Sequence, residues 1–307
     1  MEHLWIAESS AAALFQALRY AALKEINKHL STLVSTYVRI IFAFPLQTLY
    51  LVGLLFLTGA SLPPINLRFA ICSALTAIGQ FLGTAMMVRL FQLGNFAVGT
   101  MLTKCDVVLT ALIGTAFFSE QISFLGWIAI IVTVVGVMVV SAGRMPATAW
   151  RQGEISLFQL LLGKSTQLGL AIGLVNAVAY LLLKEAMLSL DQSAAPVVRA
   201  AYAGSAMNFC SVVILGGWLL VTERKGLMQI PKHQGLGWFL GIMSALGTIM
   251  WYLATVSSNA SYVAAVAQVQ VVFSLALSRY WFNERIRPVE LAGIGTILAG
   301  VLMFRLV

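Results

Sequence analysis

Two oppositely charged residues lie close together inside an apolar stretch of the chain, where ionisable side chains are rare. The stretch AVGTMLTKCDVVLTALIG contains Lys104 and Asp106 near its centre. A charged group surrounded by hydrocarbon is unfavourable, so it usually marks a path for a solute or a proton. The two side chains point about 200° apart on a helix, which makes a direct ion pair between them poor. Asp106 is a candidate for solute binding and proton coupling, while Lys104 could bind an anionic group or pair with Asp106 of a neighbouring molecule.

A second apolar stretch, AAVAQVQVVFSLALS, carries polar residues at corresponding positions. At an offset of 164 residues, Gln268 and Gln270 match the charged pair, and Ser274 matches Thr110. Because residues four apart share one face of a helix, each stretch presents a polar stripe. We expect the two stripes to face each other and to bind a solute. The alternative is that these groups make only helix-packing contacts, each worth roughly 0.6 kcal/mol.

The composition around these stretches is that of an integral membrane protein. The chain has 307 residues, of which 60% are hydrophobic and 10% charged, and its mean hydropathy is +0.91. A soluble domain contains roughly a quarter charged residues. The net charge of +8 comes mostly from basic residues in short gaps between apolar stretches, which indicates orientation in a bilayer and not nucleic-acid binding. The three cysteines lie inside apolar stretches and are odd in number, which argues against a disulfide framework.

Ten apolar stretches are long enough to cross a hydrocarbon core, which requires about twenty residues. Because backbone polar groups must be paired within lipid, such stretches form helices, and the predicted fold class is all-α. The longest gap contains ISLFQLLLGK, which predicts a linker with a short helix at the membrane interface. The predicted spans are 3–22, 31–57, 68–88, 94–118, 122–142, 166–186, 195–221, 235–256, 260–281 and 288–306.

The chain contains an internal repeat. FQALRYAALKE and VNAVAYLLLKE match at an offset of 160 residues, and FFSEQI and WFNERI match at an offset of 164, which pairs Glu120 with Glu284. The predicted organisation is a five-helix repeat at 1–143, a linker at 144–165 and a second five-helix repeat at 166–307. Because five crossings are an odd number, the second repeat enters the membrane from the opposite side, and the two repeats are inverted.

Five further residues are candidates for lining a solute cavity. Gln16 and Asn176 are amides at equivalent positions of the repeat, and Tyr20 and Tyr180 are aromatic residues at equivalent positions. Gln80 lies in the middle of the third span. Polar groups at that depth are functional candidates because lipid offers them no partner.

Trp251 and Glu8 each allow two interpretations, and two arginines are interpreted as structural. Trp251 could stack on an aromatic or cationic ligand, or serve in packing between helices. Glu8 is a candidate proton acceptor, or it faces an entrance to the interior. Arg39 and Arg199 also correspond to each other, and both lie close enough to a span end to reach the interface, so we interpret them as structural.

These features resemble the drug/metabolite transporter superfamily, specifically its EamA-type members. The resemblance rests on the SEQI and NERI turns, on the glycine-containing helices IIVTVVGVMVV and TILAGVLMF that follow them, and on arginines in the second and seventh spans. It implies a ten-helix transporter built from two five-helix repeats, located in a bacterial inner membrane. Members typically carry a proline in the middle of the fourth and ninth helices, where this chain has Val107 and Val271. Substrate and coupling ion are therefore not transferred from the resemblance.

The distribution of basic residues and the resemblance disagree about orientation. Basic residues in the gaps on one side of the predicted bundle outnumber those on the other by about thirteen to three or four. The positive-inside rule then places both termini outside the cytoplasm, whereas EamA-type members usually have cytoplasmic termini. The richer side has Arg19, Lys24, Lys28, Arg89, Arg144, Arg151, Lys164, Arg224, Lys225, Lys232, Arg279, Arg285 and Arg287; the other has Arg68, Lys184, Arg305 and, counted as a fourth, Arg199.

The sequence lacks the motifs of several other classes of protein. It contains no GxxxxGK[ST] phosphate loop, no GxSxG elbow and no HExxH, and its histidines, His3, His29 and His233, are scattered. We therefore expect no enzyme activity, no cofactor and no metal site.

The expected function is secondary transport of a small metabolite, an amino acid or related amphipathic compound, with export by alternating access as the resemblance implies. One alternative is a proton-coupled exporter of organic cations or drugs that uses Asp106. A more remote alternative, a membrane receptor or intramembrane enzyme, predicts a polar cluster without a repeat. The expected partners are the small solute, the lipid bilayer and, for the coupled alternative, protons. The chain is expected to be a monomer or a homodimer that binds no nucleic acid.

Overall fold

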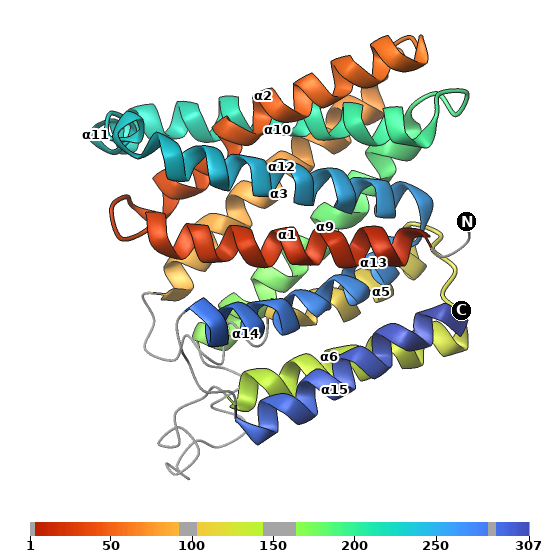
Figure 1. Cartoon of the computed structure of the whole chain (residues 1–307). Helices are drawn as coiled ribbons and strands as arrows, with labels where there is room; N and C mark the ends of the chain where they lie inside the picture. The colour runs from red at the N-terminus through yellow and green to blue at the C-terminus, as the bar shows by residue number, and fades with distance from the viewer. Residues whose placement is uncertain (1–3, 92–102, 144–163, 282–286, 307) are drawn as a thin grey trace.

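The computed structural model describes residues 4–91, 103–143, 164–281 and 287–306, and all regular elements among them are helices (Figure 1). The first half contains α1 (Leu4–Ile26), α2 (Thr32–Thr58), α3 (Leu67–Phe91), η1 (Thr103–Cys105), α5 (Asp106–Phe117) and α6 (Phe124–Gly143). The second half contains α9 (Lys164–Ser189), α10 (Pro196–Thr222), α11 (Arg224–Leu227), η2 (Ile230–His233), α12 (Gln234–Ser257), α13 (Ala260–Val266), η3 (Ala267–Val269), α14 (Gln270–Trp281), α15 (Pro288–Met303) and η4 (Phe304–Leu306).

Among the residues that the structure describes, eight helical segments are long and apolar enough to cross a membrane. Helix α1 has 23 residues but is not one of the eight, and it carries the charged residues Glu8, Arg19, Lys24 and Glu25. The fourth predicted span is described only from Thr103 onward. The structure therefore supports a multi-pass helical bundle, and the count of ten crossings stays a prediction. The predicted interfacial helix within 144–165 lies almost entirely outside the described residues, as does Glu284.

Local sequence determines where α2 begins and ends. At its start, the Ser31 hydroxyl accepts a hydrogen bond from the backbone N–H of Val34 at 3.3 Å, which satisfies one of the free donors of the first turn. At its end, Gly59 adopts a left-handed backbone conformation with φ of 63°, which a residue without Cβ adopts at little cost. The sequence between these two residues forms an uninterrupted helix of 27 residues.

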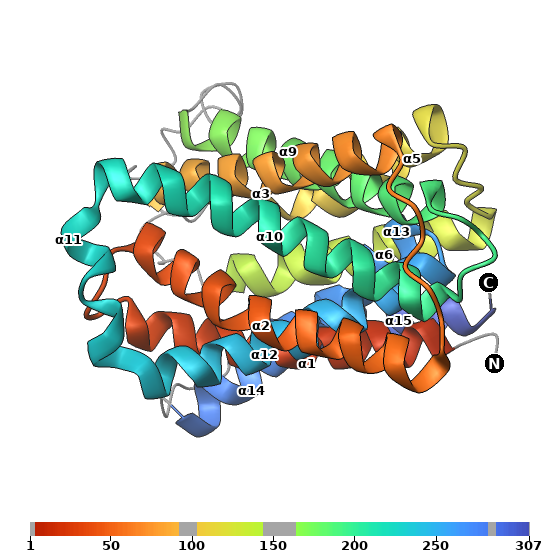
Figure 2. The same ribbon diagram turned by 90° about the horizontal axis from the view of Figure 1, so that it is seen from above.

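The helices cross the bundle in alternating directions, so both chain ends lie at one end of the molecule and α11 lies at the other (Figures 1 and 2). Helix α1 runs towards the α11 end, and α9, its counterpart in the second half, runs back from it (Figure 1). Helix α1 packs along α12 and α3 packs along α9, so that counterpart helices make counterpart contacts. The described halves are therefore inverted relative to each other.

The last long helices of the two halves, α6 and α15, meet through glycines. A Cβ atom on Gly136 would lie 2.7 Å from the backbone nitrogen of Ile297, and one on Gly300 would lie 2.8 Å from the backbone nitrogen of Thr133. Only a glycine permits such a close approach of two backbones. Gly136 and Gly300 correspond in the repeat, so the same contact is made twice, once in each direction.

Candidate functional site

Two short 3₁₀ turns directly precede helices at matching positions of the two halves. The turn η1 (Thr103–Cys105) precedes α5, and η3 (Ala267–Val269) precedes α14. These elements and the helices after them have the same lengths and are separated by the offset of 164 residues that relates the two polar stripes. A 3₁₀ turn within a helix often marks a functional site, because it leaves backbone groups without their usual partners. Neither turn contains a proline.

Three buried hydrogen-bond acceptors lie in these turns or at the first residue after them. Asp106 is 6% exposed, Gln268 4% and Gln270 7%, and one side-chain oxygen of each has no hydrogen-bond partner. Gln268 donates weakly from Nε2 to the carbonyl of Ala264, at 3.4 Å. An unsatisfied buried acceptor is unfavourable by about 1–3 kcal/mol, more when it is charged. Each of these three oxygens could therefore accept a hydrogen bond from a donor on a solute.

The hydroxyl-bearing residues of the two polar stripes, Thr110 and Ser274, differ in burial. Thr110 is fully buried and donates to the backbone carbonyl of its own Asp106 at 2.6 Å, so its hydroxyl is already engaged. Ser274 is half-buried. Helix α5 packs against α9 and α13, whereas α14 packs against α1, so the stripes border the interior from different sides. Direct facing of the two stripes stays a prediction.

A second polar group surrounds Tyr20 of α1. Gln16 donates from Nε2 to the Tyr20 hydroxyl at 3.2 Å, and the Arg19 guanidinium lies 5.2 Å from the centre of the Tyr20 ring. Lys104 and Arg39 lie within electrostatic range of Tyr20. Tyr20 keeps 46% of its surface exposed, so the polar groups around it cover only part of the ring.

A narrow pocket between α2, α3 and α10 contains Arg39. Its polar lining consists of Arg39, Gln80, Ser211 and two threonines, Thr36 and Thr84, and its free space, including the part open to solvent, is about 280 Å³. Gln80 approaches the sulfur of Met207 at 3.9 Å, a weak contact that leaves its amide available. The structural role expected for Arg39 is therefore incomplete, because its side chain lines a polar space.

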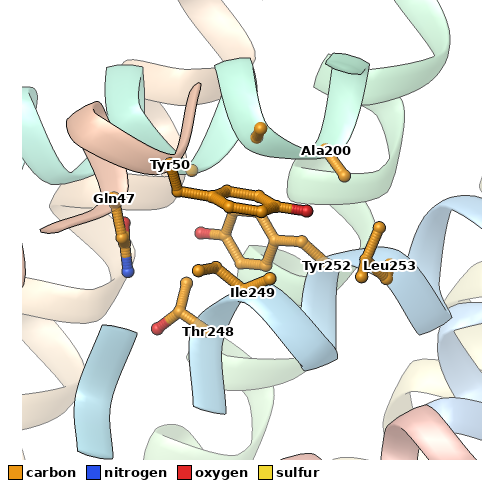
Figure 3. A pocket seen from close by; sticks show the side chains of 9 residues that line it. Gln47, Tyr50, Ala200, Thr248, Ile249, Tyr252 and Leu253 are labelled. Atoms are coloured by element: carbon orange, nitrogen blue, oxygen red, sulfur yellow. The ribbon is translucent and has the colours of Figure 1, made fainter. Parts of the chain in front are cut away.

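A second narrow pocket lies between α2, α10 and α12 (Figure 3). Side chains of Gln47 and Tyr50 from α2 and of Thr248 and Tyr252 from α12 border it (Figure 3). Gln47 accepts a hydrogen bond from Asn208, and its own amide nitrogen is buried without a partner. The Tyr252 hydroxyl lies 2.9 Å from the Met207 sulfur. Both pockets are too narrow for a metabolite unless surrounding helices move apart.

The other candidates have different surroundings. The rings of Tyr180 and Trp251 lie 5.2 Å apart, and Tyr180 is within electrostatic range of Asp106. Asn176 lies where a Cβ on Gly83 would contact its Oδ1 at 3.1 Å, so it belongs to the contact between α9 and α3.

Glu8 is partly buried, has one oxygen without a partner, and interacts with Tyr50. It lies eleven residues before Arg19 on α1, about 16 Å away along the helix.

Near the chain termini, a carboxylate network joins the two halves. Glu120, which follows α5, accepts from Lys184 Nζ at 2.8 Å, from the backbone N–H of Ala260 at 2.7 Å and from the Ser261 hydroxyl at 2.6 Å. The carboxylate therefore caps the first turn of α13 and neutralises a lysine of α9. Counting Lys184 as a free loop charge is wrong, because it lies within α9 and pairs with Glu120.

The surroundings of Arg19 differ from those expected, whereas the surroundings of Arg199 agree with its expected role. Counting Arg19 among the loop charges is wrong, because α1 continues to Ile26 and places Arg19 beside Tyr20. Arg199 is 6% exposed and donates to the side chain of Gln192, which fits a structural role. Arg19 already lay inside the predicted span 3–22, and α1 continues four residues beyond that predicted end.

Comparisons with known proteins agree with the duplicated architecture. A model of the EamA-like transporter family matches residues 3–142 and again residues 167–306. No curated protein matches the chain. A solved structure described as "Crystal structure of protein" has a TM-score of 0.74 to this chain at 11% sequence identity, over 100% of this chain and 98% of that one. At this identity the likeness concerns the fold.

Proposed function

The chain belongs to the EamA-like transporter family, within the drug/metabolite transporter superfamily, and we propose from this that it exports a small metabolite, an amino acid or related amphipathic compound, by alternating access. It is a multi-pass membrane transporter. We place it in a bacterial inner membrane, as two repeats at 1–143 and 166–307 joined by the segment 144–165. Energy would come from a coupled gradient, with protons as the candidate ion.

One observation carries this proposal: the matching 3₁₀ turns η1 and η3, each followed directly by a helix that begins at a polar residue. Each brings a buried acceptor without a partner to the start of a half-helix, Asp106 in one half and Gln270 in the other. Discontinuous helices that begin near the membrane midplane are how inverted-repeat transporters build solute sites. An amino acid's ammonium group supplies the donors that these acceptors lack.

The network around Glu120 supports a state that is closed at the end carrying the termini. It ties α5 of the first half to α9 and α13 of the second. Aromatic rings of Trp5, Tyr262 and Phe304 pack within 6.1 Å of one another at the same end. In an alternating-access cycle these contacts would have to separate before the solute leaves there.

Counterflow in proteoliposomes tests the proposal. Vesicles loaded with an unlabelled amino acid should take up the labelled one, and a panel of amino acids, amines, purines and choline-like cations identifies the class. The variants D106A and Q270A should lose exchange, whereas Q229A, at an exposed glutamine, should keep it. Exchange retained in D106A and Q270A would mean that the two stripes serve packing only.

The second candidate, a proton-coupled organic-cation exporter, is favoured by the same unpartnered oxygen of Asp106. A carboxylate without an ion-pair partner in the described part of the chain can hold either an amine or a proton. This candidate predicts exchange of amines that have no carboxylate. The amino-acid proposal predicts that such amines exchange poorly.

A further inference from the structure

We propose that Arg19, Arg39 and Lys104 form an anion subsite that binds the carboxylate of the transported solute. The inference rests on the proposed transport function and specifies its substrate class: compounds with a carboxylate, amino acids among them. It is carried by three cationic side chains from three different helical segments: Arg19 lies over the Tyr20 ring at 5.2 Å, Arg39 lines a polar pocket, and Lys104 lies two residues before Asp106.

The positions of the two arginines place them at the same depth. Arg19 lies seven residues before the end of α1, and Arg39 lies seven residues after the start of α2. At 1.5 Å per residue, both lie about 10 Å inside the end of the bundle where these successive helices join. Arg39 acts electrostatically on both Arg19 and Tyr20. The two arginines therefore lie at a similar depth, towards the α11 end of the bundle.

Lys104 extends this region towards the acceptor site. It belongs to η1, and its charge acts on Tyr20 of α1 and on Asp106. The cationic region and the acceptors of the polar stripes are thus neighbours. A solute with an ammonium and a carboxylate would meet donors at one end and acceptors at the other.

The cations lack neutralising partners. Within the described ranges, no carboxylate lies at ion-pair distance from Arg19, Arg39 or Lys104, and Nε of Arg19 is buried without a partner. By contrast, Arg68 pairs with Glu185 at 2.7 Å; Arg199 donates to the neutral side chain of Gln192 and also has a buried Nε without a partner. Charges within a membrane protein that remain unpaired are unfavourable unless a ligand completes them.

The shape of the Arg39 pocket fits the same ligand chemistry. Besides Arg39, hydroxyl groups of Thr36 and Ser211 and the Gln80 amide border the space. A guanidinium fork with nearby hydroxyl and amide donors is the usual environment of a bound carboxylate. The pocket between α2, α10 and α12 contains only neutral groups. The negative charge of the ligand's carboxylate is therefore recognised at Arg39.

A matched ligand series tests the subsite. Purified protein is subjected to thermal unfolding with L-phenylalanine, phenethylamine and 3-phenylpropanoate, and with L-leucine, 3-methylbutan-1-amine and 4-methylpentanoate. Within each set only the charged groups differ. We expect the carboxylate-bearing compounds to raise the melting temperature and the amines to have little effect, because a ligand that binds the folded state stabilises it.

Variants separate charge recognition from folding. R39Q and R19Q should weaken carboxylate binding by about tenfold or more, since a charge-assisted hydrogen bond is worth roughly 1.5–3 kcal/mol. R39K should retain part of the binding, and R224Q, which alters an exposed arginine of α11, should retain all of it. An unchanged melting temperature of R39Q without ligand establishes that the variant is folded; if R39Q is unstable, R39K and R19Q provide the comparison.

Three results would overturn the inference: stabilisation by the amines and not by the acids, an unchanged response to acids in R19Q and R39Q, or no response to any acid in the wild type. A response that depends on Arg39 but appears only with phosphatidylglycerol in the bilayer would identify the anion as a lipid headgroup, which also contradicts the inference. Failure of the transport proposal is a separate outcome: acids would bind through Arg39 but would not exchange across proteoliposomes.

Discussion

Lys184 Nζ lies 2.8 Å from Oε1 of Glu120, and this ion pair joins a helix of the second repeat to the end of a helix of the first. The Glu120 side chain is 2% exposed and that of Lys184 14%, so water hardly screens the pair. The carboxylate is further held by the backbone of Ala260 and the hydroxyl of Ser261. A single carboxylate thus joins α9 and α13 of the second repeat to the end of α5 in the first.

Replacing Glu120 by glutamine should therefore destabilise the protein. E120Q leaves Lys184 buried without its counter-charge, and breaking a buried pair by removing one partner costs about 3–5 kcal/mol. The free energy of unfolding in detergent measures the loss. The double variant E120Q/K184M should lose less than the sum of the single variants, because no unpaired charge is left.

The exposed pair of Lys28 and Glu25 provides the control. It has a similar distance, 2.7 Å, but side chains that are 58% and 47% exposed. E25Q should cost at most about 0.5 kcal/mol, because exposed pairs contribute little. Equal losses in E25Q and E120Q would show that burial of the Glu120 pair is energetically unimportant.

Asp106 should carry coupling to protons if the transporter is proton-driven. D106N removes the titratable group but keeps an oxygen acceptor of the same shape. We expect uptake driven by a pH gradient to be lost and solute counterflow to persist, as measured in the same proteoliposomes. T110V is the matched variant on the same face of α5, where the hydroxyl only contacts its own helix; gradient-driven uptake should survive there. Normal gradient-driven uptake by D106N would rule out this role.

The contact between α6 and α15 should tolerate no side chain at Gly300. G300A places a methyl group 2.8 Å from the backbone nitrogen of Thr133 and 3.1 Å from the carbonyl of Ala129, which should destabilise the protein by about 1–3 kcal/mol. The control is G295A on the same helix, where nothing lies within 4 Å. That variant should be neutral or slightly stabilising, because alanine favours helices over glycine. Similar melting temperatures for the two variants would contradict the close packing.

The orientation in the membrane should follow the basic residues. The structure places Lys28, Arg224 and Lys232 at the α11 end, opposite both termini (Figure 2). The positive-inside rule then predicts that the termini lie outside the cytoplasm. Alkaline phosphatase fused after residue 307 should be active, and green fluorescent protein at the same place should be dark. The reverse pattern would agree with the usual orientation of the family.

The family and the duplication were predictable from sequence because they depend on patterns that persist along the whole chain. The match of FFSEQI with WFNERI and the polar stripes at one offset indicated the repeat, and the family model confirms two copies. The 3₁₀ turns were not predictable: neither TKC nor AQV contains a residue that breaks a helix. Their position follows from packing around the interior, which local propensity does not describe.

The candidate site was predictable only in part. Asp106, Gln268 and Gln270 stood out because each interrupts an apolar stretch, and all three are buried with unsatisfied oxygens. Arg19 and Gln47 were missed for different reasons. Arg19 lies near a predicted helix end that proved too short, and Gln47 lacks a polar counterpart in the repeat, since the residue 160 positions later is Met207.

The matching 3₁₀ turns η1 and η3 bear on which of the two alternating-access states is more stable without a bound solute. If the two repeats were identical, the states open to either side of the membrane would be equally stable. Any bias must then arise where the copies disagree, and at these turns they disagree most in charge: Lys104 and Asp106 on one side, two neutral glutamines on the other. A few substitutions at these turns would therefore shift the balance between the two states without altering the helical scaffold.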